Sequence, residues 1–211
     1  MTIAEIYQAY QIMPNLQQHM FRVTGVAEQV CQHLQAHVER ENILRACLLH
    51  DMGNIIKFDL QYFPEFLEPE GLEYWQQVKD EFIQKYGKNP HHATIAIVTE
   101  LGVSDRIKEL IDAVGFNLAK KNFESDDFSR KVCAYADMRV APHGVVSLSE
   151  RLEDGRKRYE AKGDHNTFSY VMGAFLKKIE KQLFEKMDIG PEDVTEKSVT
   201  PLTEKYPALE L

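Results

Sequence analysis

Apolar residues recur at helical spacing along most of the chain. Between residues 16 and 38 they fall three or four positions apart, at Leu16, Met20, Val23, Ala27, Val30, Leu34 and Val38. This spacing predicts a helix with one buried face. No run of alternating apolar and polar residues indicates a strand. The pattern therefore predicts an all-α fold.

The remaining helices are predicted from the same periodicity and from the positions of Pro, Gly and capping residues. They cover residues 2–10, 43–50, 72–86, 90–102, 104–114, 126–139 and 149–161, and a last long helix begins at Asp164. Residues 195–211 contain Pro201 and Pro207 and show little periodicity. We therefore expect one helical domain over residues 1–194 and an extended tail over residues 195–211.

The most apolar of these segments ends in two ionisable residues. Residues 43–49 are almost entirely apolar, and His50 and Asp51 follow directly. Two such groups at the end of a buried helix are unfavourable unless something pairs with them. A divalent metal ion is a suitable partner, because imidazole and carboxylate groups bind Zn, Mn, Fe and Co. Gly53 is expected to stop the helix and to leave one side of the pair open.

Composition limits the class of protein. The chain has 211 residues, of which 44% are hydrophobic and 27% charged, as in ordinary globular proteins. It contains no apolar run of about 20 residues, it begins without a secretory signal pattern, and its three cysteines are widely spaced. We expect a cytoplasmic protein with reduced thiols. Its net charge of -8 argues against nucleic acid and anionic membranes as partners.

Three further residues are candidates for the same site. His19, His92 (with His91 beside it) and Asp137 each lie in or near an apolar helix. A single buried His or Asp is most often a hydrogen-bonded core residue. Together with His50 and Asp51, however, these residues provide the mixed nitrogen and oxygen ligands of a transition-metal site.

The order His, His-Asp, Asp is carried by three short segments. They are HMFRV at 19–23, LLHDMG at 48–53 and YADMRVAP at 135–142. This pattern resembles the HD-domain metal-dependent phosphohydrolase superfamily from about residue 16 to residue 160. The resemblance implies a single helical HD domain, with His19, His50, Asp51 and Asp137 as metal ligands. It also implies hydrolysis of a small phosphoester, with nucleotides favoured as substrates.

Some members of that superfamily hold two metals and use two further histidines. His92 looks like the first of these, but Asn117 stands near the place where the second would be expected. We therefore predict one divalent ion for each chain, drawn from Mn, Fe, Co, Zn, Ni and Mg. In that reading Asp137 or His92 orients or deprotonates the attacking water, and Lys57 and Arg22 neutralise charge on the phosphate.

Several alternatives stay open at this stage. A helical binding or regulatory protein without turnover would keep the same ligands. A di-iron oxygenase is also known on HD-type folds, although the missing histidine near Asn117 counts against it. The aromatic residues of segment 58–86 belong to the core, to a homodimer surface, or to a lid whose rings stack on a base. The basic sequence RLEDGRKRY at 151–159 is a solvated helix face or steers an anionic substrate.

Overall fold

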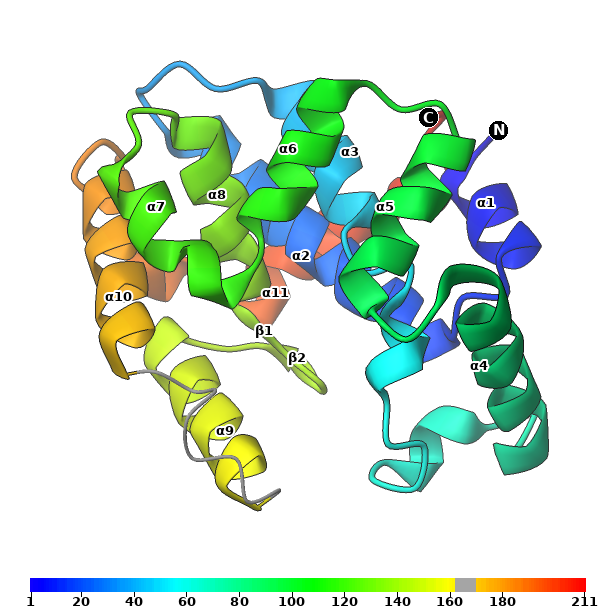
Figure 1. Cartoon of the computed structure of the whole chain (residues 1–211). Coiled ribbons are helices and arrows are strands. Elements are labelled where there is room, and N and C mark those ends of the chain that lie inside the picture. The colour runs from blue at the N-terminus through cyan, green and yellow to red at the C-terminus, as the bar shows by residue number, and fades with distance from the viewer. Residues whose placement is uncertain (162–169) are drawn as a thin grey trace.

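The computed structural model describes residues 1–161 and 170–211, and most of this part is helical (Figure 1). The helices are α1 (Ile3–Ala9), α2 (Pro14–His33), α3 (Arg40–Leu49), α4 (Leu72–Tyr86), α5 (Pro90–Glu100), α6 (Asp105–Ala113), α7 (Ala119–Glu124), α8 (Phe128–Asp137), α9 (Leu148–Ala161), α10 (Tyr170–Phe184) and α11 (Glu196–Thr203). Strands β1 (Val140–Ala141) and β2 (Gly144–Val145) form one short antiparallel hairpin, with Val140 opposite Val145. The predicted all-α fold is confirmed. The predicted start of the last long helix at Asp164 lies outside the described residues.

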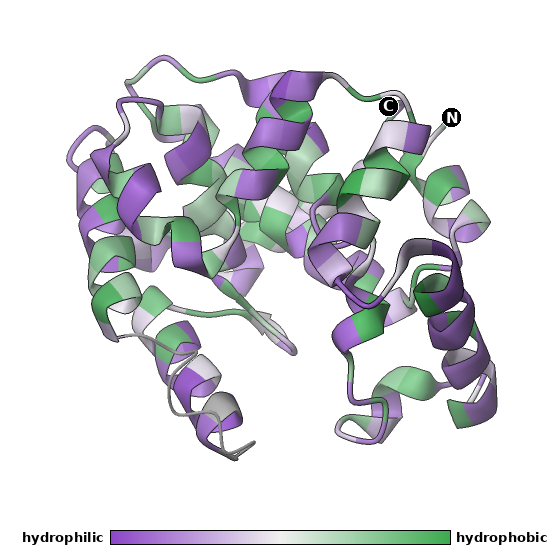
Figure 2. Cartoon of the chain, in the orientation of Figure 1, coloured by the Kyte–Doolittle hydropathy of each residue, from purple (hydrophilic) through white to green (hydrophobic). Residues whose placement is uncertain are grey.

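Helix α2 lies at the centre of the fold and packs against α3, α8 and α11. Its side chains Met20, Val23, Ala27 and Val30 are fully buried, as their spacing predicts. Each large apolar side chain of this kind contributes about 1.5–3 kcal/mol when it leaves water. Figure 2 shows mainly hydrophilic residues on α4, at the periphery of the molecule. Burial of the apolar face of α2 therefore organises the surrounding helices.

Helix α2 ends earlier than the apolar pattern predicts. The expected helix extended to Val38, but Leu34 already has an extended backbone and forms an isolated bridge with Met187. Leu34 is nevertheless buried. The periodic apolar residues therefore continue to pack against the core after the helix has ended, and periodicity alone cannot locate its end.

Gly53 does not act as the helix-ending residue that the sequence suggested. Helix α3 ends at Leu49, and His50 caps it in a right-handed conformation. Gly53 has a φ of -94°, which any residue can adopt. A Cβ atom at Gly53 would lie 2.4 Å from the Pro90 carbonyl oxygen and 2.7 Å from the Ala93 Cβ. Glycine is needed here because α5 approaches the backbone closely.

The predicted extended tail is wrong. Residues from Glu196 to Thr203 form α11, which packs on α2, and Val199 is fully buried. A Cβ atom on Gly25 would lie 2.6 Å from a methyl carbon of Val199, so the glycine permits this close approach. The two chain ends also meet, since the Leu211 N–H donates to the Met1 carbonyl (Figure 1). Helix α11 is too short for a clear apolar period, and Pro201 made a helix there look improbable.

A buried carboxylate on α2 holds the C-terminal segment. Glu28 accepts hydrogen bonds from the Tyr206 hydroxyl and from Lys205 Nζ, the latter at 2.6 Å. Arg40 Nη2 also donates to it. Burial raises the pKa of Glu28, but these three donors outweigh burial and hold the pKa below its usual value. Residues 195–211 are therefore part of the helical body.

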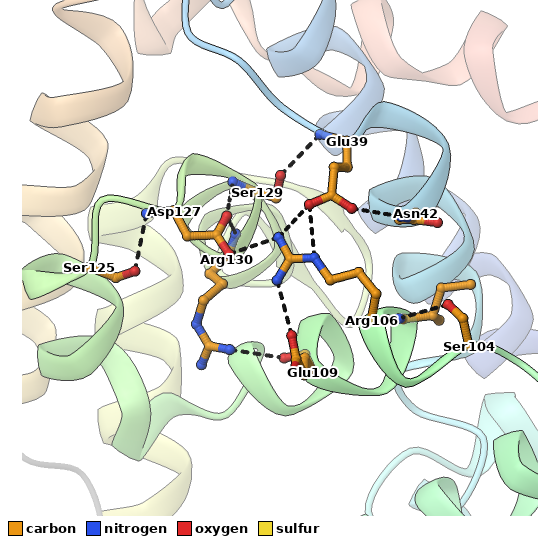
Figure 3. A network of polar contacts seen from close by, with 10 residues as sticks. Glu39, Asn42, Ser104, Arg106, Glu109, Ser125, Asp127, Ser129 and Arg130 are labelled. Atoms are coloured by element: carbon orange, nitrogen blue, oxygen red, sulfur yellow. Dashed lines mark hydrogen bonds and ion pairs between the residues drawn. The ribbon is translucent and has the colours of Figure 1, made fainter.

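An arginine on α6 joins the N-terminal ends of α3 and α8 (Figure 3). Arg106 Nε donates to Glu39 Oε1 at 2.8 Å, and its Nη2 donates to Asp127 Oδ2 at 2.8 Å. Glu39 precedes α3, and Asp127 caps α8 by accepting from the Ser129 N–H. The two helices joined in this way are those whose other ends carry the candidate metal ligands.

Candidate metal centre

Four predicted ligands from three helices converge at one point. His19 comes from α2, His50 and Asp51 from the end of α3, and Asp137 is the last residue of α8. His19 Nε2 lies 3.1 Å from Asp137 Oδ1 and 3.6 Å from Asp51 Oδ2. His50 Nε2 lies 3.4 Å and 3.6 Å from the same two oxygens. Ligand atoms bound to one first-row metal ion at about 2.0–2.2 Å lie roughly 3–3.5 Å from each other. The separations here, 3.1–3.6 Å, are close to that range, so a small inward shift would let the four residues share one cation.

The orientation of His50 is fixed by its neighbours. Its Nδ1 lies 2.8 Å from the Cys47 carbonyl oxygen, which can only accept a hydrogen bond. Nδ1 is therefore the protonated nitrogen and donates. Nε2 is buried and forms no hydrogen bond in the part of the chain that the structure describes. A buried nitrogen without a partner, facing two carboxylates, is the arrangement expected of a metal ligand.

The two carboxylates of the centre favour a positive charge beside them. Burial lowers the pKa of His50, but the charges of Asp51 and Asp137 outweigh burial and raise it to about 9. Burial raises the pKa of Asp137, but its contacts with His19 and His50 outweigh burial and hold it well below its usual value. Two carboxylates beside two imidazoles thus favour a positive charge between them. The donor set fits a divalent transition metal.

The centre opens into a cavity of about 450 Å³, and His19, Asp51 and Asp137 form part of its lining. Aromatic rings form another part of the wall, at Phe58, Tyr62, Phe63 and Phe66. His143, at the tip of the hairpin, contacts Phe63 and Phe66 with ring centroids 5.4 Å apart in each case. The lining thus combines a candidate metal site with rings that can stack on a planar group.

The structure brings Lys57 into this cavity, but it does not bring Arg22 or His92 there. Lys57 is exposed and belongs to the lining. Arg22 Nε is bound to Glu196 Oε1 at 2.8 Å, so this cation pairs with the C-terminal helix. His92 is exposed in the first turn of α5. Neither Arg22 nor His92 belongs to the described residues that line the cavity.

The sequence left open the role of two arginines of the lining. Arg151 and Arg158 lie on α9 and line the same cavity as the candidate ligands. Both belong to the basic sequence at 151–159. Its charge made steering of an anionic substrate one interpretation, but it did not show where in the fold these arginines lie. Only the fold shows that one face of α9 is turned towards the candidate metal centre.

Comparison with known proteins agrees with this geometry. A family model for the HD domain matches residues 16–151. The chain belongs to the HD-domain metal-dependent phosphohydrolase superfamily. Searches of curated proteins and of solved structures returned no match. None of the helices in the described part of the chain has the length and apolar character needed to cross a membrane.

Proposed function

We propose that this protein is a metal-dependent phosphohydrolase that acts on a small phosphoester, with a nucleotide as the favoured class. The observation that carries the proposal is the buried Nε2 of His50, which has no hydrogen-bond partner among the described residues and faces Asp51 and Asp137. His19 completes the donor set from a different helix. Membership of the superfamily supports the same reading.

The chain's own residues would divide the work of hydrolysis. His19, His50, Asp51 and Asp137 would hold a divalent ion, which supplies a Lewis acid for a phosphate oxygen and an activated water when bound. Asp137 is kept ionised by His19 and His50 and can orient a water at the base of the cavity. Lys57, on the wall, can neutralise charge on the phosphate.

The shape and lining of the cavity support a nucleotide. Its volume of about 450 Å³ lies within the range of about 300–1,000 Å³ that is usual for small-molecule sites. An inorganic phosphate would fill only a part of it. The rings of Phe63 and Phe66 offer faces for a base. The catalytic roles predicted for Arg22 and His92 receive no support from their positions and stay predictions.

Metal analysis followed by a phosphoester panel tests the proposal. The purified protein should contain a divalent metal and should hydrolyse at least one nucleotide phosphoester with that metal. Asp51→Ala should abolish both properties, because it removes a carboxylate from the donor set. Asp188→Ala is a matched control, since Asp188 binds His33 Nδ1 at 2.7 Å in an exposed pair outside the cavity.

The other outcomes favour the alternatives. Bound metal without hydrolysis of any phosphoester would favour a binding or regulatory protein. Two irons and oxygen-dependent turnover would favour a di-iron oxygenase. Full activity in the Asp51→Ala variant would disprove the proposed centre.

A further inference from the structure

One face of α9 presents two arginines to the cavity. Arg151 and Arg158 are seven residues apart, so they lie on the same side of the helix and about 10 Å apart along its axis. Arg151 is near the hairpin, because its Nε donates to the Val140 carbonyl at 2.8 Å. Arg158 lies about two turns farther along α9.

The two guanidinium groups share one carboxylate. Arg158 Nη2 donates to Asp154 Oδ2 at 2.7 Å, and Arg151 Nη1 lies 3.5 Å from the same oxygen. The Nε of Arg158 is buried and donates to no acceptor in the part of the chain that the structure describes. A buried donor without an acceptor is unfavourable. Arg158 lines the cavity, so a shift of its side chain towards an anion there would give this donor an acceptor.

The charge balance of the cavity points the same way. A divalent ion would balance Asp51 and Asp137. The remaining charged side chains of the lining are then the cations Lys57, Arg151 and Arg158 and one carboxylate, Asp59. The chain as a whole has a net charge of -8. Asp154, which pairs with both arginines, offsets one more of these positive charges. The wall is still net positive, and a positive wall on an acidic protein concentrates anions.

We propose that Arg151 and Arg158 bind a second anionic group of the ligand, separate from the phosphate at the metal centre. The ligand class is then a compound with at least two phosphate or carboxylate groups, such as an oligophosphate or a bisphosphate. Planar guanidinium groups suit such groups because they donate paired hydrogen bonds. The identity of the ligand as a substrate rests on the proposed function, whereas anion binding by the arginines does not need turnover.

Calorimetric titration with inorganic tripolyphosphate and with inorganic phosphate tests the proposal. The metal-loaded full chain should bind tripolyphosphate more tightly than phosphate. Arg158→Gln should weaken tripolyphosphate binding by about tenfold or more, because it removes a charged hydrogen-bond donor. It should weaken phosphate binding much less.

Arg156→Gln provides a matched control on the same helix. Arg156 pairs with Glu153 and Glu160 and does not belong to the described lining. This variant should bind tripolyphosphate as the unmodified protein does. Arg158→Lys keeps the charge but loses the paired donors. Its affinity for tripolyphosphate should therefore fall between those of the unmodified protein and the Arg158→Gln variant. If circular dichroism shows that Arg158→Gln does not fold, the Arg158→Lys variant still tests the proposal.

Three results would overturn the anion site. They are failure to bind tripolyphosphate, equal affinity for tripolyphosphate and phosphate, and equal affinity of the Arg158→Gln and Arg156→Gln variants for tripolyphosphate. Failure of the proposed function looks different. A protein that binds tripolyphosphate through Arg158 but hydrolyses no phosphoester would disprove hydrolysis and leave the anion site intact.

Discussion

His50 donates from Nδ1 to the carbonyl oxygen of Cys47, one turn earlier in the chain, at 2.8 Å. This hydrogen bond fixes the ring orientation and leaves Nε2 directed at Asp51 and Asp137. In metal-binding histidines, the ring nitrogen that does not bind the metal usually donates a hydrogen bond of this kind, which sets the tautomer before the metal binds. The end of α3 therefore supplies a prepared nitrogen ligand.

Metal removal should lower thermal stability. A ligand that binds only the folded chain at about 100 times its dissociation constant stabilises it by about 2.7 kcal/mol. For a chain of this size that corresponds to a rise of roughly 5–10 °C in Tm. Differential scanning calorimetry with and without a chelator would measure the shift. Asp137→Asn should show almost no shift, whereas Asp188→Asn should behave like the unmodified protein. A metal-dependent shift that persists in Asp137→Asn would contradict the ligand assignment.

Metal content should be about one ion for each chain. The described residues form one cluster of His19, His50 and Asp51 with Asp137 beside it. His92 is exposed outside the described lining of the cavity, so His92→Ala should retain the metal. Elemental analysis of both proteins would measure the stoichiometry. Two ions in the unmodified protein, one of them lost in His92→Ala, would show that His92 is a ligand.

The hydroxyl of Tyr206 should contribute to global stability. It is fully buried and donates to Glu28, so Tyr206→Phe leaves a buried carboxylate with one donor fewer. Hydrogen bonds to charged groups contribute about 1.5–3 kcal/mol. Urea unfolding should show a loss of that size. Tyr74→Phe is the control, because Tyr74 is exposed and, among the described residues, its hydroxyl accepts only a surface hydrogen bond from Gln11. Equal stability of the two variants would show that residues 195–211 are not firmly docked.

Glu28 should also make stability depend on pH in the acid range. Its pKa is lowered from 4.5 in the folded chain, so the unfolded chain binds the proton more readily. The stabilisation from Glu28 is therefore fully present above pH 4.5 and is lost as the pH falls through the lower folded value. Glu28→Gln lacks this contribution. The stability difference between the unmodified protein and Glu28→Gln should be largest near neutral pH and should shrink below about pH 4. Urea unfolding at a series of pH values would measure it, and a difference independent of pH would contradict the assigned ionisation.

Local apolar spacing predicts the helical fold, and the resemblance to the HD-domain superfamily adds His19 and Asp137 to His50 and Asp51 as ligands. Apolar spacing identifies the buried faces, and His50 and Asp51 stand out at the end of an apolar run. The position of Arg22 could not be predicted in this way. Its spacing from His19 suggested a phosphate contact, but Glu196 binds it from a helix that lies 174 residues later in the chain.

Burial of short segments is equally hidden from local patterns. Val199 and Tyr206 are fully buried within elements too short to show a period. Arg158 stood within a basic sequence whose solvated and functional interpretations were both open. Its placement depends on which face of α9 is turned to the cavity, and that is set by contacts such as Arg151 with Val140. Contacts between separate elements thus decide which short segments are buried and which helix face is turned to the cavity, and the local sequence pattern does not show either.

Arg106 should support both stability and metal affinity from a distance. It bonds Glu39 and Asp127 at the N-terminal ends of α3 and α8, whose other ends carry His50 and Asp137 (Figure 3). Arg106→Lys should cost about 1–3 kcal/mol of unfolding free energy, because one ammonium group cannot replace the fork that bridges two carboxylates. Lys108→Gln is the control on the same helix, since Lys108 pairs only with the exposed Asp105 among the described residues. Urea unfolding and metal titration of both variants would test this. Loss of stability with an unchanged metal affinity would show that α3 and α8 hold the ligands without the help of Arg106.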